Sequence, residues 1–73
     1  MTSGYSEQRM RLALFTRDLN LGQAARQCGI SEDKFRKKVH SGKWWISEVT
    51  AIVKALQMDV AEMLGIFFAN EVN

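Results

Sequence analysis

The sequence predicts one all-α domain of five short helices, and three observations support this. Helix-capping residues recur along the chain, each followed by a segment with apolar residues at intervals of three and four. Proline, internal repeats and linker-like stretches are absent. The 73 residues, of which 47% are hydrophobic, suffice for a single small core, so residues 1–73 are expected to form one domain.

The first predicted helix runs from about Ser6 to Asp18. Residues 1–5 show no apolar periodicity, and we expect them to be disordered. The apolar stripe of this helix is broad and comprises Met10, Leu12, Leu14, Phe15 and Leu19. Its arginines are expected to stay in solvent; they are Arg9, Arg11 and Arg17.

Residues 20–40 are predicted to form two helices that meet at a steep angle. Asn20 is a good N-cap for the first of them, and Gln23 completes a capping box. Gly29 follows the last periodic residue, where a left-handed backbone is needed and glycine has no steric penalty. The buried stripe of this helix is Ala24, Ala25 and Cys28, and Ile30 is expected to fill the corner.

Ser31 caps the second helix of this pair, whose inward face is Phe35 and Val39. Its other positions are polar: Glu32, Asp33, Arg36, Lys37 and His40. This combination predicts a helix-turn-helix whose second helix presents a polar face to a partner.

Two tryptophans follow Gly42, the helix breaker in the loop predicted after the second helix. We expect Trp44 to fill the gap between neighbouring helices and Trp45 to be partly exposed. The alternative is that an indole rests on a DNA backbone beside Lys43. Ser47 is predicted to cap a fourth helix that ends near Gln57, with a buried stripe of Val49, Ile52, Val53 and Leu56.

Asp59 is predicted to cap a fifth helix, with Glu62 completing a second capping box. Its expected inner side is Val60, Met63, Leu64, Phe67 and Phe68. Ile66 falls outside that stripe and Val72 lies beyond it, so the end of the chain carries more apolar surface than a small domain hides. We therefore predict a dimer or partner interface made by Ile66, Phe67, Phe68 and Val72. The alternative is that the helix folds back over the core.

Positive charge is concentrated in one short segment, although the net charge is only +2. Five of the ten Lys and Arg residues lie between residues 34 and 43, which indicates a surface for a polyanion. The single cysteine and single histidine cannot build a disulfide or a zinc site. We find no set of catalytic residues, so neither an enzyme, a small-molecule substrate nor a cofactor is predicted. No apolar run is long enough to span a membrane, and we expect a cytoplasmic protein.

The spacing of Ala25, Gly29, Ile30-Ser31 and Phe35 resembles the Cro/repressor-type (XRE-like) helix-turn-helix family. The stretches Phe35-Arg-Lys-Lys-Val, Ile46-Ser-Glu-Val and Ile66-Phe-Phe-Ala-Asn-Glu-Val are similar to short phage-encoded regulators of Gram-positive hosts. The resemblance covers roughly residues 10–72. The chain departs from the family at Leu21, where a glutamine is common, and in the two acids that begin the second helix.

The resemblance implies a sequence-specific DNA-binding transcription regulator that reads double-stranded operator DNA through the second helix of the motif. The expected base-reading residues are Glu32, Asp33, Arg36, Lys37 and His40. The expected phosphate contacts are Asn20, Gln23, Lys34, Lys38, Lys43 and Trp44. Because one unit reads few base pairs, we expect a homodimer or a heterodimer with a repressor. The alternative function is a protein-interaction modulator that binds a partner repressor and changes its DNA binding.

Overall fold

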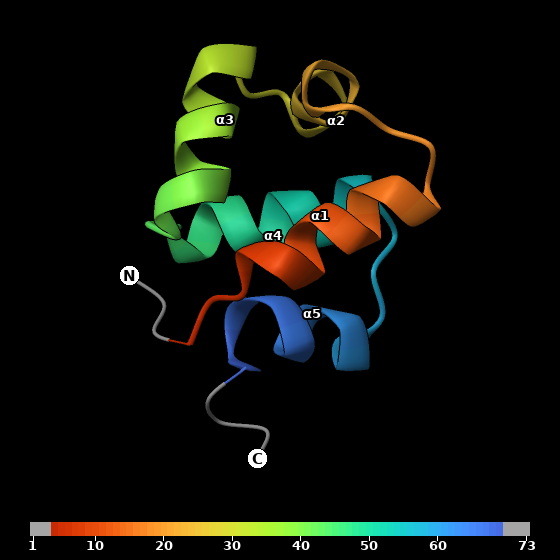
Figure 1. The fold of residues 1–73 in the computed structure, drawn as a ribbon, viewed down its shortest axis with the longest axis vertical. Coiled ribbons are helices and arrows are strands. Elements are labelled where there is room, and N and C mark those ends of the chain that lie inside the picture. Colours follow the sequence, from red (N-terminus) through yellow and green to blue (C-terminus); the bar gives the residue numbers. More distant parts are fainter. Residues whose placement is uncertain (1–3, 70–73) are drawn as a thin grey trace.

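Five α-helices follow one another in the computed structural model, which describes residues 4–69 (Figure 1). They are α1 (Glu7–Thr16), α2 (Leu21–Cys28), α3 (Glu32–Ser41), α4 (Ile46–Ala55) and α5 (Val60–Phe67). The predicted all-α class and the predicted number and order of helices are confirmed for these residues. None of the helices described in residues 4–69 is both long enough and apolar enough to span a membrane.

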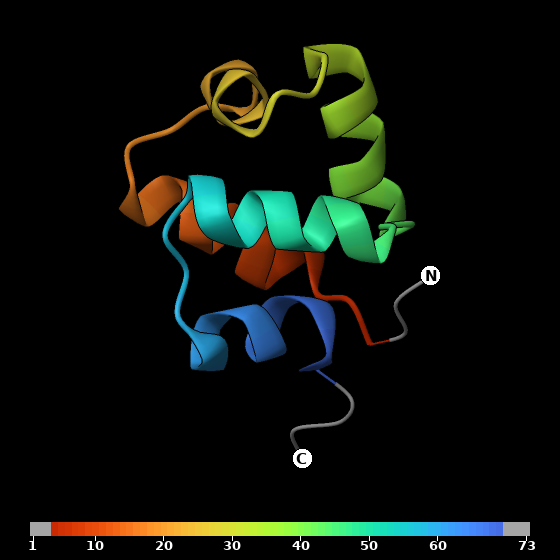
Figure 2. The same cartoon turned by 180° about the vertical axis from the view of Figure 1, so that it is seen from behind.

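The helices α2 and α3 lie together at one end of the molecule, and α5 lies at the other. In Figure 1, α2 is seen nearly end-on while α3 runs in the plane of the picture, so their axes cross steeply. The view from behind in Figure 2 brings α4 to the front, between the α2–α3 pair and α5. This arrangement leaves one side of α3 at the edge of the molecule.

An aromatic cluster centred on Trp44 forms the middle of the core. Trp44 is fully buried, as predicted, and its ring packs edge-on against Phe35 of α3 and Phe67 of α5. The ring centroids are 5.7 Å and 5.8 Å apart, within the range of favourable edge-to-face pairs. The loop after α3 is thus fixed to both α3 and α5.

Most helix starts follow the capping residues that the sequence predicts. Asn20 and Gln23 form the predicted reciprocal capping box, and the Ser31 side chain accepts a hydrogen bond from the backbone of Lys34. The expected cap at Ser47 is wrong, because α4 begins two residues earlier than predicted, with Trp45 as N-cap. Glu48 reaches back to accept the N–H of Trp45 at 2.8 Å, which replaces the missing side-chain cap.

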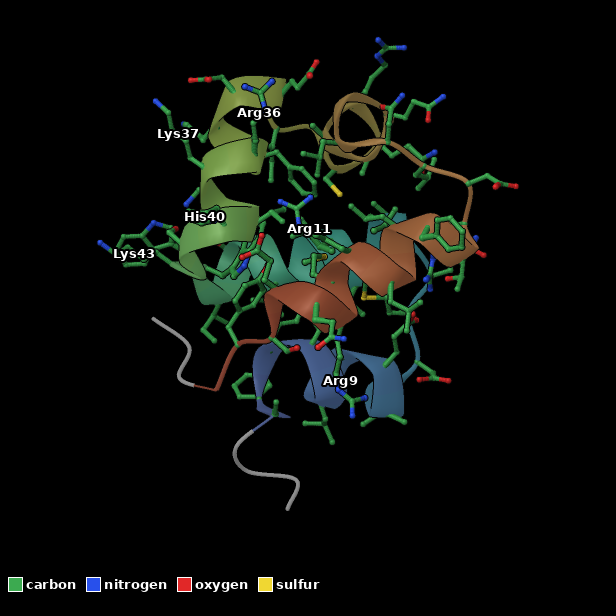
Figure 3. All side chains as sticks on the ribbon, in the orientation of Figure 1. Arg9, Arg11, Arg36, Lys37, His40 and Lys43 are labelled. Carbon is green, nitrogen blue, oxygen red and sulfur yellow. The ribbon has the colours of Figure 1, made fainter. Side chains whose placement is uncertain are left out.

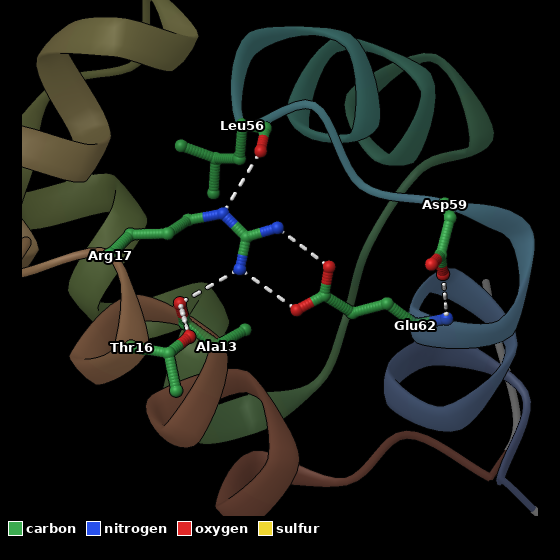
Figure 4. A network of polar contacts seen from close by, with 6 residues as sticks. All are labelled: Ala13, Thr16, Arg17, Leu56, Asp59 and Glu62. Atoms are coloured by element: carbon green, nitrogen blue, oxygen red, sulfur yellow. Dashed lines mark hydrogen bonds and ion pairs between the residues drawn. The ribbon is translucent and has the colours of Figure 1, made fainter.

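The predictions for Glu62 and Arg17 are both wrong, because these two side chains bind each other. Asp59 caps α5 through the N–H of Glu62, but the Glu62 carboxylate does not complete the capping box. It binds Arg17, which we expected to stay in solvent (Figure 4). An ion pair across two helices has replaced a local backbone contact.

The expected apolar stripe of α1 is too broad. Met10 and Leu14 are buried, but Leu12 is 58% exposed and Phe15 is 77% exposed. The helix buries one narrow face against its neighbours, and Leu12 and Phe15 lie on the other side.

The N-terminal expectation is wrong at Tyr5, which packs against the core. Its hydroxyl donates a hydrogen bond to the backbone oxygen of Val39 at 2.6 Å, and its ring lies near Trp44 and Phe67. The backbone around it pairs with the end of α5, where Ser6 N–H donates to the oxygen of Ile66 at 2.8 Å. Residues 1–3 lie outside the described part of the chain.

The predicted C-terminal interface is wrong at Ile66 and Phe67, which are both buried in the core. The orientation of α5 differs from the predicted stripe, since Val60 is 67% exposed and Ile66 faces inward. Phe68 is half-buried against the core, and Val72 lies outside the described residues. Val53 and Leu64, which we expected to be buried, are only half-buried.

Candidate nucleic-acid interface

The helix α3 is held firmly at both ends and along one side. Ser31 caps its start, and its end is closed by Gly42, whose φ of 75° is in the left-handed region that favours glycine. Phe35 and Val39 are fully buried, which fixes the orientation of the helix. The opposite side of α3 therefore faces solvent.

All five predicted base-reading residues lie on exposed positions of α3; they are Glu32, Asp33, Arg36, Lys37 and His40. Figure 3 shows Arg36, Lys37 and His40 along one side of the helix, with Lys43 beyond its end. Their arrangement follows directly from the helical spacing and from the burial of Phe35 and Val39.

The two acids at the start of α3 form ion pairs with the basic residues one turn later. Arg36 Nη2 lies 3.1 Å from Glu32 Oε2, and Lys37 Nζ lies 3.2 Å from Asp33 Oδ2. Arg36 Nη1 is also 3.8 Å from Asp33 Oδ1. All four side chains are more than half exposed, so each pair contributes less than about 1 kcal/mol and can open when a stronger partner arrives.

His40 connects this face to the first turn of α1. Its Nδ1 lies 3.5 Å from Glu7 Oε1, and the other oxygen of Glu7 accepts a hydrogen bond from Arg11 Nε at 2.9 Å. When His40 is protonated, the same carboxylate serves two cations. The edge of the candidate interface therefore includes α1 as well as α3.

Lys38 is not the free phosphate contact that the sequence predicts. Its Nζ donates to Glu48 Oε1 at 3.0 Å and to the backbone oxygen of Lys43 at 3.3 Å, and its side chain is only 15% exposed. Burial alone would raise the pKa of Glu48. The hydrogen bonds from the Trp45 N–H and from Lys38, together with the charges of Lys38 and Lys34, outweigh burial and lower that pKa below its usual value. Lys34 and Lys43 remain exposed, as expected.

The predicted phosphate contacts at the start of α2 use their side chains to cap the helix. Asn20 Oδ1 accepts the N–H of Gln23 at 2.8 Å, and Gln23 Oε1 accepts the N–H of Asn20 at 2.9 Å. Both residues are exposed beside a polar hollow that also includes Arg26 and Glu32. The sequence analysis missed Arg26, although it is the only charged residue of α2.

The close approach of α2 and α3 at this hollow depends on Gly22. A Cβ atom at that position would lie 2.8 Å from Glu32 Oε1, so a larger residue would force the Glu32 side chain to move. The position of Glu32 on the exposed face is thus set partly by α2.

Trp44 cannot contact DNA, because it is fully buried in the aromatic cluster. Trp45 is the exposed member of the pair, at 66%, and it lies next to Lys43. Of the two indoles, only that of Trp45 is accessible for the predicted contact with a DNA backbone beside Lys43.

The chain matches no protein-family model, no curated protein and no solved structure. What the protein does is therefore inferred from its residues and their geometry.

Proposed function

We propose that the protein is a transcription regulator of the Cro/repressor (XRE-like) type that binds duplex DNA by placing α3 in the major groove. One observation carries this proposal. A helix capped at both ends and anchored by two buried side chains presents Arg36, Lys37 and His40 on one exposed side. The major groove is about 12 Å wide, admits an α-helix and displays a distinct pattern for each base pair.

The exposed residues of α3 have the chemistry that groove recognition requires. Arg36 can donate two hydrogen bonds to guanine, and Glu32 or Asp33 can accept one from the amino group of cytosine. The ion pairs with Glu32 and Asp33 would open when Arg36 and Lys37 meet DNA. Their side chains are exposed, so that step has a small cost.

The surrounding residues would position the helix on the phosphate backbone. Lys34, in the first turn of α3, and Lys43, just beyond its end, are both exposed. The first turn of α2 offers the backbone N–H groups of Leu21 and Gly22, which the capping box of Asn20 and Gln23 does not use, and the positive end of a helix dipole. These contacts would fix the orientation of the protein without reading sequence.

A gel shift over a range of salt concentrations tests the proposal. Affinity for duplex DNA should fall linearly with log salt, with a slope of about −0.9 per phosphate neutralised. Lys43→Ala should reduce that slope by about one on every sequence, whereas Arg36→Ala should cost about 1–3 kcal/mol on a selected site and relax its specificity. Lys54→Ala, at the end of α4 away from α3, is the matched control. Salt-independent affinity, or no binding at low salt, contradicts the proposal.

We further propose that the regulator acts as a dimer, with itself or with a repressor, because two half-sites about 34 Å apart give useful specificity. Ile66 and Phe67 cannot form the joining surface, since both are in the core. Analytical ultracentrifugation with and without DNA tests this. A chain that stays monomeric in both conditions, and with the repressor added, contradicts it.

The second candidate function is a modulator that binds a repressor instead of DNA. The ion pairs on α3 favour it, since Glu32 and Asp33 offset the charges of Arg36 and Lys37 where a polyanion would bind. The net charge of only +2 points the same way. A gel shift with neighbouring intergenic DNA and the adjacent repressor separates the two. A modulator would change the repressor's shift and give none by itself.

A further inference from the structure

An apolar hollow of about 310 Å³ lies at the junction of α3 and α4, and its function is not explained by groove recognition. We call it the Trp45 pocket; it is lined by Lys38, Lys43, Trp44 and Trp45. Trp45 and its neighbour Ile46 are both exposed, at 66% and 61%. Two large adjacent apolar side chains in solvent, beside a concave apolar surface, are typical of protein interaction sites.

One wall and part of the rim of the Trp45 pocket are held in place by their neighbours. Trp44 is fixed between Phe35 and Phe67, and it cannot turn into solvent. Glu48 accepts both the N–H of Trp45 and the ammonium of Lys38, which holds the rim in place. A pre-formed pocket loses little conformational freedom when a ligand enters, which favours binding.

The surroundings of the pocket are positively charged. Lys43 is exposed at its rim, and Lys34 lies one turn before Lys38 along α3. The carboxylate of Glu48 is already paired with Lys38 at 3.0 Å. Lys34, Lys38 and Lys43 carry three positive charges here, and Glu48, whose carboxylate interacts with the charges of both Lys38 and Lys34, supplies one negative charge against them. A net positive charge remains, and an acidic partner fits best.

We propose that the Trp45 pocket binds an acidic segment of a partner protein. An aliphatic or aromatic side chain of that segment enters the hollow against the two indoles, and neighbouring carboxylates pair with Lys34 and Lys43. The chemistry favours protein over duplex nucleic acid, because the bases of a duplex are stacked on one another and its phosphate backbone supplies negative charge but no apolar group that fills the hollow. An anchoring apolar residue within an acidic segment supplies both.

This second site does not depend on DNA binding, but it would affect it. Lys43 belongs both to the rim of the pocket and to the proposed phosphate contacts. An acidic segment bound there would occupy the end of the DNA-binding surface and compete with duplex DNA. The pocket would thus give a protein partner a means of controlling the regulator.

The test is a selection of short random displayed peptides on the full chain, with peptides that bind the bare support removed first. The enriched peptides should carry Leu, Phe or Trp flanked by Asp and Glu. A synthetic peptide with the enriched sequence should lose about 30-fold in affinity on Trp45→Ala, the loss expected for a central anchor contact. Phe15→Ala, which removes another exposed aromatic side chain, on α1, should leave the affinity unchanged.

Lys43→Glu provides a second, independent variant, because it changes only an exposed side chain. It should weaken the binding of the same peptide and reduce the salt dependence of that binding, with Lys34 supplying what remains. Arg36→Ala should weaken DNA binding alone, so failure of the pocket and failure of groove recognition are distinguishable. The proposal is wrong if no acidic peptides are enriched or if Trp45→Ala binds them equally well. If Trp45→Ala weakens only the binding of duplex DNA and not that of the peptide, Trp45 is a DNA contact and the proposal is also wrong.

Discussion

Arg17, at the end of α1, forms a two-point ion pair with Glu62 of α5 (Figure 4). Nη2 lies 2.6 Å from Oε1, and Nη1 lies 2.8 Å from Oε2. The same guanidinium donates to the backbone oxygens of Leu56 and Ala13, each at 2.9 Å. The hydrogen bond to Glu62 raises the pKa of Arg17 more than burial lowers it. One side chain therefore joins the ends of α1 and α4 to α5.

We expect Arg17→Ala to lower the free energy of unfolding by about 1–3 kcal/mol, because it removes charge-assisted hydrogen bonds to the Glu62 carboxylate and to the backbone oxygens of Leu56 and Ala13. Arg17→Lys should recover only part of the loss, since an ammonium cannot reproduce the bidentate geometry. Arg11→Ala, which breaks a single exposed pair with Glu7, should change stability by less than about 1 kcal/mol. Urea unfolding of the three variants measures this, and equal losses for Arg11→Ala and Arg17→Ala would contradict it.

Tyr5 should make the protein sensitive to alkaline pH. Burial raises the pKa of its hydroxyl above the usual value. The unfolded chain loses the Tyr5 proton above about pH 10 while the folded chain retains it, so stability should fall as the pH rises through that range. Tyr5→Phe should cost about 1 kcal/mol at neutral pH, because the oxygen of Val39 loses its donor. The stability of the variant should also fall less steeply at alkaline pH. Thermal unfolding from neutral to alkaline pH measures both effects.

The end of α5 should be required for the fold and not only for association. Phe67→Ala should cost about 3–5 kcal/mol, because the side chain is fully buried against Trp44. That is most of the stability of a small domain, so removing residues 66–73 should leave an unfolded chain. Val60→Ala, at an exposed position of the same helix, should change stability by about 0.5 kcal/mol or less. Circular dichroism measures the helix content of the truncated chain. A truncated chain that stays helical would show that the end of α5 is not required for the fold.

The role of Glu32 can be determined from whether Glu32→Gln raises or lowers the affinity for DNA. Glu32→Gln frees Arg36 from its 3.1 Å pair and removes a negative charge from the DNA-facing side. If Glu32 only opposes phosphates, affinity for every duplex should rise by about 0.5–1 kcal/mol. If it accepts a hydrogen bond from cytosine, affinity for a selected site should fall by about 1–3 kcal/mol.

Asp18→Asn is the matched control for Glu32→Gln, because it removes one exposed negative charge at the end of α1 and because asparagine tolerates the positive φ of that position. Filter binding at two salt concentrations distinguishes the outcomes for both variants. An equal effect of the two substitutions would mean that only net charge matters.

The sequence by itself determined the features that depend on neighbours within one helical turn. The cap at Ser31, the capping box of Asn20 and Gln23, and the left-handed turn at Gly29 are local interactions, and each lies where the sequence predicts it. The exposed face of α3 follows in the same way, since burying Phe35 and Val39 leaves its polar residues in solvent.

Only the tertiary structure decided which apolar and charged residues meet across the fold. Arg17 and Glu62 are 45 positions apart, and Tyr5 and Val39 are 34 apart, so no local pattern pairs them. The rotation of α1 and α5 placed Phe15 in solvent and Ile66 in the core. Both helices are apolar over more of their circumference than one packed face can bury. Packing against neighbouring helices, and not periodicity, therefore selected the buried side.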